Sequence, residues 1–300
     1  RQRQMCIRDR SLSSIVTRIA LQRRNYAPGI STRFHTMNQY PKRLSQACAL
    51  IAAVMASGCS TKPLDLNSAS QGSQLTPVAV KTSQFSVQTL QPARVNSNVL
   101  RVYIEGDGRA WITSHTISND PTPIKSIAPG LAVNDPQPAA YMARPCQYVQ
   151  GANCSQRLWT TGRFGKDVVQ AESEVLDALK SRYGVQEFEL VGYSGGGAVA
   201  LLLAATRSDV KQVQTIAGNI DPTAWTSLKH LAPLSNSLNP ADFADQLAKV
   251  PQRHFIGMND TVVPPEVSKA YMLKVQPTCG EIVFVSADHH AGYELSLIHI

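Results

Sequence analysis

The stretch that decides the fold reads FELVGYSGGGAVA over residues 188–200. Residues 188–191 form a short apolar run typical of a buried strand, and residues 195–207 are almost wholly apolar, which predicts a buried helix. Between them lies a G-x-S-x-G pattern, in which a serine occupies the tight turn from strand to helix. The pattern makes Ser194 a candidate nucleophile. The alternative interpretation is a Gly/Ser turn with a structural role only.

The neighbours of this serine favour the chemical interpretation. Gly192 and Gly196 lack side chains that would clash where the strand and the helix nearly meet. The start of the helix supplies backbone N–H groups, and the N–H of Gly195 is a candidate donor to a developing oxyanion. A serine hydroxyl is a weak nucleophile without a base, and the base needs an orienting acid. The sequence must therefore supply a histidine and a carboxylate.

Outward from this stretch, the chain from residue 97 alternates apolar strand patterns with helical patterns. Strand, helix, strand repetition predicts an α/β fold, a mostly parallel sheet with helices on both faces. One helix is predicted over Lys166–Tyr183, and further strands are predicted over Val99–Ile104, Val210–Ile216 and residues 254–256 and 281–285.

Three features together resemble the α/β-hydrolase superfamily of serine hydrolases. They are the G-x-S-x-G turn, Gly257-Met258-Asn259-Asp260 after a later strand, and Asp288-His289-His290 after the last strand. The resemblance covers residues 97–294 and implies Asp260 as the acid and His289 as the base. Asp221 competes for the first role and His290 for the second.

The resemblance also implies an oxyanion loop after the early strand, at Glu105-Gly106-Asp107-Gly108. The N–H of Asp107 would join that of Gly195 in the oxyanion hole. Glu105 departs from the family pattern, which commonly has a histidine there. Residues 219–250 interrupt the strand–helix rhythm and form either a short lid or an ordinary long connection.

The N-terminal part reads as an export signal. Residues 37–58 combine a start methionine, the charged Lys42 and Arg43, and a short apolar run that ends in Ala56-Ser57-Gly58 before Cys59. This order resembles a lipobox, whose cysteine is acylated, and Ser60 is compatible with outer-membrane sorting. The alternative is a plain signal peptide in which Cys59 is incidental. The expected location is the bacterial cell envelope, with the protein held by a lipid anchor.

The remaining boundaries follow from composition. Residues 1–36 are interpreted as an upstream, non-native segment and residues 295–300 as an artefactual tail. Residues 59–96 are rich in Ser, Gln, Thr and Pro and are interpreted as a flexible tether with room for one strand at its end. Cys146 and Cys154 lie eight residues apart in a Pro/Gly/Asn-containing stretch, which favours a local disulfide and leaves Cys279 free.

The charge balance argues against a nucleic-acid partner. Residues 1–58 carry ten Lys and Arg and one Asp, whereas residues 59–300 carry 19 Lys and Arg and 20 Asp and Glu. The basic excess therefore lies in the leader.

Two adjacent histidines without a third ligand predict no metal site, and no cofactor is expected. The sequence thus predicts a serine hydrolase of the carboxylesterase type, acting on a small-molecule ester or lipid. The alternatives are a peptidase or amidase on the same residues, or a surface-binding lipoprotein without catalysis.

Overall fold

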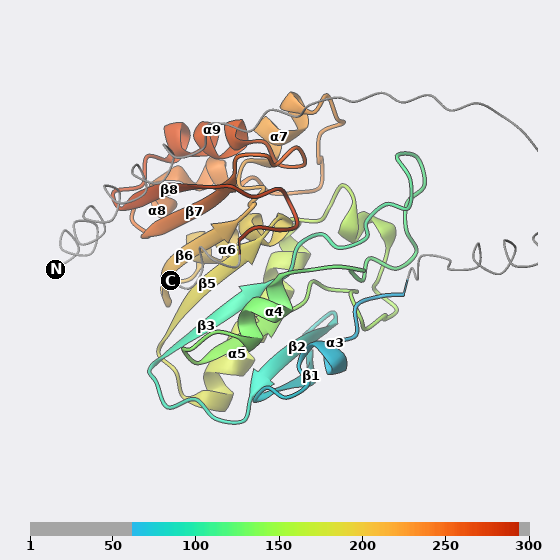
Figure 1. Ribbon diagram of the computed structural model, residues 1–300, viewed down its shortest axis with the longest axis vertical. Helices are drawn as coiled ribbons and strands as arrows, with labels where there is room; N and C mark the ends of the chain where they lie inside the picture. The colour runs from blue at the N-terminus through green and yellow to red at the C-terminus, as the bar shows by residue number, and fades with distance from the viewer. Residues whose placement is uncertain (1–61, 294–300) are drawn as a thin grey trace, which may run out of the picture. The chain divides into compact units, whose positions relative to one another are not determined.

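The computed structural model describes residues 62–293. Within them lies an eight-stranded sheet in the order β1-β2-β4-β3-β5-β6-β7-β8 (Figure 1). The first two pairings, β1 with β2 and β2 with β4, are antiparallel, and all the later ones are parallel. The strands span Leu75–Lys81, Ser86–Pro92, Val99–Ile104, Ala139–Met142, Glu187–Tyr193, Val210–Ile216, Gln252–Gly257 and Gly280–Val285, from β1 to β8 in chain order.

Both faces of the sheet carry an apolar core, because side chains alternate along each strand. On β3, Leu100 and Ile104 contribute to one core and Tyr103 to the other. The first core includes buried side chains of α5 (Lys166–Tyr183), α6 (Gly195–Thr206), α8 (Ala244–Leu247) and α9 (Pro265–Val275). The second includes those of the short helices α3 (Leu66–Ala69) and α4 (Ala128–Val133). The predicted α/β class, with helices on both faces of a mostly parallel sheet, is confirmed.

The two central helices follow from their sequences. In α5, Val168, Val175 and Leu179 are buried on one side, and Gly184 ends the helix in the left-handed conformation. Its bounds are those that the apolar spacing predicts. All side chains from Gly195 to Ala204 in α6 are buried, as expected for a helix that is apolar all round.

The expected flexible tether over residues 59–96 is wrong for the part that the structure describes. Residues 66–92 form α3 and the hairpin of β1 and β2, which extends the sheet. Val87 and Leu90 of β2 are fully buried, whereas β1 lies at the edge and is exposed at most positions. A one-sided edge strand needs few apolar residues, so this segment has the composition of a linker while forming part of the sheet.

Other elements have no counterpart in the sequence analysis. They are β4, α4, α9 and the 3₁₀ helix η3 (Gln156–Trp159). Residues 219–250 contain α7 (Pro222–Leu228), the 3₁₀ helix η4 (Pro240–Phe243) and α8.

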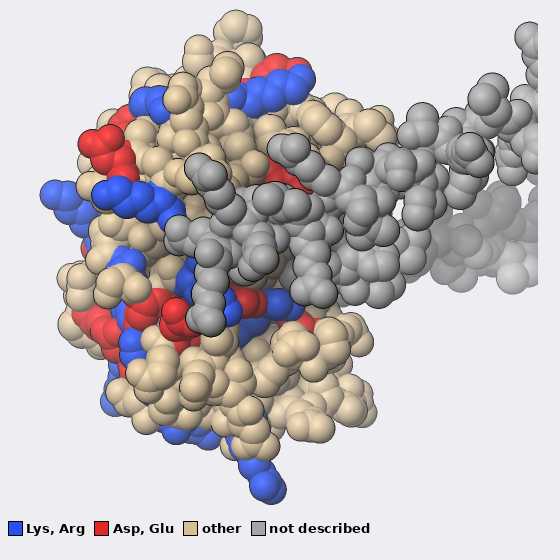
Figure 2. Space-filling model, turned by 90° about the vertical axis from the view of Figure 1, so that its left-hand side faces the viewer, with Lys and Arg blue, Asp and Glu red and all other residues tan. Residues whose placement is uncertain are grey.

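Four predictions lie outside the described residues. They concern the segments 1–36, 37–58 and 295–300, and Cys59. On the face shown in Figure 2, basic and acidic side chains are interspersed.

Candidate active site

Ser194 forms the turn between β5 and α6 in a conformation that L-residues rarely adopt. Its φ is 52° and its ψ is −120°, and such backbone strain persists only where the surroundings hold it in place. The N–H of Ser194 donates to the carbonyl of Ile216 at 2.9 Å, and its own carbonyl accepts from the N–H of Asn219 at 2.9 Å. The last residue of β6 and the loop after it therefore hold the turn in this conformation.

The flanking glycines are required by close backbone contacts. A Cβ atom on Gly192 would lie 2.3 Å from the carbonyl oxygen of Gly196, and one on Gly196 would lie 2.4 Å from that of Ile104. Any side chain at either position would therefore force the strand and the helix apart. This is the steric reason for the spacing of the G-x-S-x-G pattern.

The structure brings Ser194, His289 and Asp260 into one chain of hydrogen bonds. Oγ of Ser194 lies 2.9 Å from Nε2 of His289, and Nδ1 of His289 lies 2.8 Å from Oδ2 of Asp260. These residues follow β5, β8 and β7, whose carboxyl ends meet at one edge of the parallel sheet. An ionised Asp260 only accepts hydrogen bonds, so Nδ1 carries the proton and Nε2 is free to accept from the serine hydroxyl.

The carboxylate of Asp260 is held at both oxygens. Oδ1 accepts from the N–H groups of Val262 and Val263 at 2.8 and 2.9 Å, which leaves Oδ2 to His289. The competing Asp221 instead accepts from the N–H of Ala224 and so caps α7. Of the two candidate acids, only Asp260 contacts the histidine within the described residues.

The second histidine lies beside this chain without joining it. The hydroxyl of Tyr193 donates to the carbonyl of His289 at 3.0 Å, and Nδ1 of His290 lies 3.1 Å from the same hydroxyl oxygen. Burial and the neighbouring His289 lower the pKa of His290. Asp288, just before the pair, accepts from the N–H groups of His290 and Ala291, which shapes the loop and lowers the pKa of its carboxyl.

The predicted oxyanion loop lies against the nucleophile. A Cβ atom on Gly106 would be 3.1 Å from Cβ of Ser194, and one on Gly195 would be 2.1 Å from Oδ1 of Asp107. Within residues 62–293, neither the N–H of Asp107 nor that of Gly195 has a hydrogen-bond acceptor. No other group of the described chain therefore occupies either N–H of the predicted donor pair.

Two arginines form ion pairs with the carboxylate of this loop. The Asp107 carboxylate pairs with Arg163 at 2.7 Å and with Arg144 at 3.5 Å, and Arg144 also pairs with the buried Glu172 at 2.7 Å. Glu105, which stands at the family's histidine position, is itself buried, and burial raises its pKa. Its carboxyl accepts hydrogen bonds from Ser126, Tyr141 and the N–H of Gly106.

A cavity of about 700 Å³ opens above Ser194 and His289. Its wall is mostly apolar, with the cations Lys125 and Arg163 among the lining residues. The segment 231–234 and Trp225, from the interval where a lid or a connection is expected, form part of the wall. The apolar side chains that line it are Ala110, Trp111, Pro123, Trp225, Leu231, Ala232, Pro233, Leu234, Val262 and Val263.

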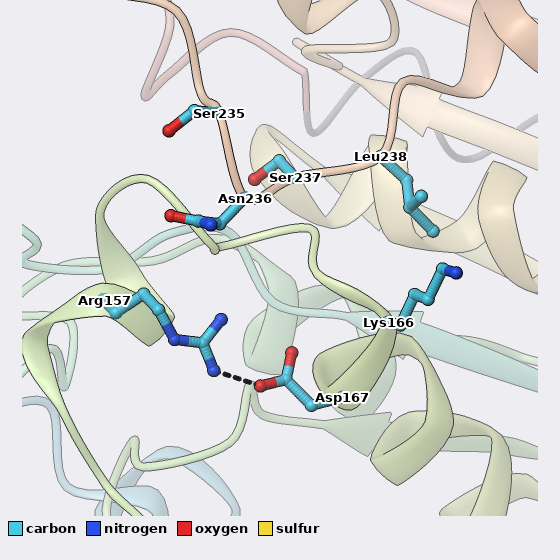
Figure 3. A pocket seen from close by; sticks show the side chains of 7 residues that line it. All are labelled: Arg157, Lys166, Asp167, Ser235, Asn236, Ser237 and Leu238. Atoms are coloured by element: carbon cyan, nitrogen blue, oxygen red, sulfur yellow. Dashed lines mark hydrogen bonds and ion pairs between the residues drawn. The ribbon is translucent and has the colours of Figure 1, made fainter.

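A second hollow, of about 440 Å³, lies at the start of α5 (Figure 3). Arg157 and Asp167 form an ion pair in it, and Lys166 with residues 235–238 completes the wall. None of the predicted site residues lines it. The cavity above Ser194 is therefore the one associated with the predicted chemistry.

Three further findings concern the cysteines, metal binding and membrane spans. Cys146 and Cys154 form the expected disulfide, with Cα atoms 5.7 Å apart, whereas Cys279, expected to be free, is also disulfide-bonded. Within residues 62–293, no cluster of three or more His, Cys, Asp or Glu is arranged to hold a metal ion. Over the same residues, no helix combines the length and the apolar character needed to span a membrane.

The sequence analysis missed the residues that support the oxyanion loop. Arg144, Gln147 and Arg163 contact residues 106–107 across 37 to 56 positions of the chain. Nothing in the local pattern around them indicates these contacts.

No protein-family model matches the chain, and no curated protein sequence matches it. Its fold is similar to that of an esterase from Pyrococcus furiosus, at 12% identity over 78% of this chain and 89% of that chain, with a TM-score of 0.57. It is also similar to a puromycin-hydrolyzing peptidase from Mycobacterium tuberculosis, at 15% identity over 75% of this chain and 37% of that chain, with a TM-score of 0.55.

A third likeness is to an acylaminoacyl peptidase from Pyrococcus horikoshii, at 12% identity over 85% of this chain and 41% of that chain, with a TM-score of 0.50. The chain thus spans most of the length of the esterase but less than half of each peptidase. At these identities the likeness concerns the fold alone.

Proposed function

We propose that this chain, which has the α/β-hydrolase fold, is a serine hydrolase that cleaves carboxylic esters through an acyl-enzyme intermediate. One observation carries the proposal. The hydrogen-bonded chain from Ser194 through His289 to Asp260 opens into a mostly apolar cavity of about 700 Å³. A binding protein without catalytic activity would have no need for a strained serine placed beside an oriented histidine.

In the proposed reaction, His289 takes the proton of Ser194 while Oγ attacks the ester carbonyl carbon. The N–H groups of Gly195 and Asp107 donate to the oxyanion of the tetrahedral intermediate. His289 then gives its proton to the departing alkoxide, which leaves an acyl group on Ser194. Water attacks that acyl group with His289 as the base, and His289 returns its proton to Oγ of Ser194 as the Ser194–acyl bond breaks and the carboxylic acid leaves. Asp260 holds the imidazole in place throughout.

The cavity supports an ester with apolar parts as the substrate. Trp111, Trp225, Leu231 and Leu234 can bury an acyl chain or an aromatic group, and burying apolar surface is favourable by about 25 cal/mol per Å². The proposed catalytic residues Ser194, His289 and Asp260 could also cleave amides, and two of the similar folds belong to peptidases. The ester is preferred because an apolar wall offers few partners for the polar backbone of a peptide.

The proposal extends to the location of the protein. A lipid on Cys59 would hold the hydrolase in the bacterial cell envelope, and the sequence before Cys59 is the support for this part. The location and the chemistry rest on separate observations, so either can fail without the other.

A fluorophosphonate probe tests the chemistry. The wild-type protein is expected to become labelled at Ser194 and to hydrolyse p-nitrophenyl esters faster than the matching p-nitroanilides. Ser194→Ala should lose labelling and about 10⁴- to 10⁶-fold in rate, whereas Ser268→Ala, a buried serine of α9, should lose neither. Faster cleavage of the anilides would favour the amidase, and the absence of both labelling and turnover would favour a non-catalytic binding protein.

A further inference from the structure

The peptide bond between Gly106 and Asp107 is the part of the site whose orientation matters most. Its N–H is one of the two amides without an acceptor beside Ser194 in the described part of the chain. A planar peptide directs its C=O and N–H to opposite sides. Whatever fixes the carbonyl of Gly106 therefore fixes the direction of the N–H of Asp107.

Gln147 binds that carbonyl. Its Nε2 donates to the carbonyl oxygen of Gly106 at 3.0 Å, and the side chain is buried. Its Oε1 accepts from the N–H of Arg144 at 3.0 Å. A backbone N–H can only donate and a carbonyl can only accept, so the two bonds together determine which end of the amide faces Gly106. Gln147 itself does not line the cavity.

The segment around Gln147 is strained. Cys146 and Tyr148 both have positive φ, 69° and 63°, and a non-glycine residue in this region costs about 1–3 kcal/mol. The disulfide from Cys146 to Cys154 and the bond from the N–H of Tyr148 to Thr122 hold this conformation. Two strained residues on either side of one buried glutamine indicate that the loop is built to place its side chain.

We propose that Gln147 is a positioning residue of the oxyanion hole. It acts through the Gly106 carbonyl, turns the N–H of Asp107 toward the substrate oxyanion, and touches neither the substrate nor the reacting atoms. The proposal rests on the serine hydrolase function proposed above. Its effect belongs to the transition state, because an oxyanion is present there and absent from the bound ester.

Gln147→Glu is the sharpest test, because it keeps the shape and the acceptor for Arg144 but replaces the donor to Gly106 with a carboxylate oxygen. Loss of one oxyanion donor costs about 10²- to 10³-fold, so a misdirected donor should lower kcat by roughly 10- to 100-fold. KM should stay within about threefold. A trifluoromethyl ketone that forms a tetrahedral adduct on Ser194 should bind more weakly by a similar factor.

Gln147→Met removes both side-chain bonds at similar volume and serves as a second variant if the introduced carboxyl prevents folding. The matched control is Gln150→Met, which lies in the same disulfide-closed loop and whose Nε2 donates to the carbonyl of Cys146 at 2.8 Å. The control should keep kcat and ketone affinity within about twofold of the wild type. Melting temperatures of all variants show whether each is folded.

The proposal is overturned if a folded Gln147 variant keeps the wild-type kcat, if it changes KM alone, or if Gln150→Met loses as much kcat. These outcomes differ from failure of the proposed function, in which the wild-type protein itself is neither labelled at Ser194 nor active on esters. In that last case, the positioning role is rejected together with the function.

Discussion

Nε2 of His289 lies 2.9 Å from Oγ of Ser194, while the ring of the adjacent His290 is turned to the hydroxyl of Tyr193 at 3.1 Å. Adjacent side chains of this loop thus point to different partners, and one of the two is placed to accept the serine proton. Both histidines line the cavity, but His290 does not contact Ser194. The identical side-chain chemistry of the two residues makes them a matched pair for mutation.

We expect His289→Ala to lose about 10⁴- to 10⁶-fold in kcat on an activated ester, as for a residue of a catalytic triad. His290→Ala should stay within about tenfold, with the change mainly in KM, because His290 borders the substrate cavity. Circular dichroism confirms that both variants fold. Near-complete loss in His290→Ala with activity kept in His289→Ala would show that the assignment is wrong.

A second comparison concerns the acid. Asp260→Asn should lower kcat by about 10⁴-fold, because an amide at this position favours the wrong tautomer of His289. Asp221→Asn should leave kcat nearly unchanged, and Asp221→Ala should cost about 1 kcal/mol of stability through the lost cap of α7. Steady-state rates and denaturant unfolding measure both effects. Greater loss of activity in Asp221→Asn would reverse the assignment.

The pair of Asp107 and Arg163 gives a third prediction. A carboxylate beside the proposed oxyanion hole opposes the negative charge of the transition state, and Arg163 at 2.7 Å offsets it. Arg163→Gln should therefore lower kcat by about tenfold. Adding Asp107→Asn should restore most of that loss, since the uncompensated charge is then removed.

A double-mutant cycle on kcat measures this coupling. If Arg163 contacts the substrate directly instead, the double variant would be no better than Arg163→Gln alone. The cycle therefore distinguishes charge compensation from substrate binding, both of which the position of Arg163 in the cavity wall allows.

How much of this site the sequence can predict depends on the distance between the contacting residues. Ser194, Asp260 and His289 each follow a strand, and the order of strands in a parallel sheet brings their loops together. No such rule predicts the position of Gln147, because its contact with Gly106 spans 41 residues and depends on a loop closed by a disulfide. A side chain that contacts only backbone atoms does not belong to a recognisable sequence motif.

The fold shows the same limit. Three elements have the predicted bounds, because in each the pattern of apolar residues is clear and so is the point where it stops. They are Val99–Ile104, Lys166–Tyr183 and Val210–Ile216. α9 is missed because Pro264 and Pro265 read as a turn, although proline is favoured at the first position of a helix. Its buried Val267, Tyr271 and Val275 recur every fourth residue, but the polar side chains between them dilute the pattern.

Stability should depend on pH through Glu172. Burial raises its pKa from 4.5 to about 7, against the opposing effect of Arg144, and its Oε2 has no hydrogen-bond partner among residues 62–293. Between these values the folded protein binds more protons than the unfolded chain, so the free energy of unfolding falls as pH rises from about 5 to 7. Relative to Glu172→Gln, the wild type should lose about 2–3 kcal/mol between pH 5 and pH 8.

Urea unfolding at several pH values measures this difference. Glu266→Gln, an exposed carboxylate of α9, is the control and should leave the pH dependence of the wild type unchanged. A parallel pH dependence in the wild type and in Glu172→Gln would contradict the assignment to Glu172.

Lipidation is tested independently of the chemistry. We expect metabolic labelling with a fatty-acid analogue to mark the wild-type protein and not Cys59→Ser, because the motif places the acyl group on that thiol. Cys59→Ser should then appear in the soluble fraction with its esterase activity intact. Equal labelling of the two proteins would reject Cys59 as the lipid attachment site.

The position of β8 has a consequence for how activity is lost. The strand lies at the edge of the described sheet, pairs only with β7 there, and is buried only at Val285, yet the proposed base His289 follows it by four residues. Edge elements with few buried contacts open locally at a lower free energy than the central strands. Opening of β8 would withdraw the imidazole while Ser194, on the central β5–α6 turn, kept its conformation. Inactivation on heating would then precede global unfolding and be reversible, and amide hydrogens of β8 would exchange sooner than those of β5.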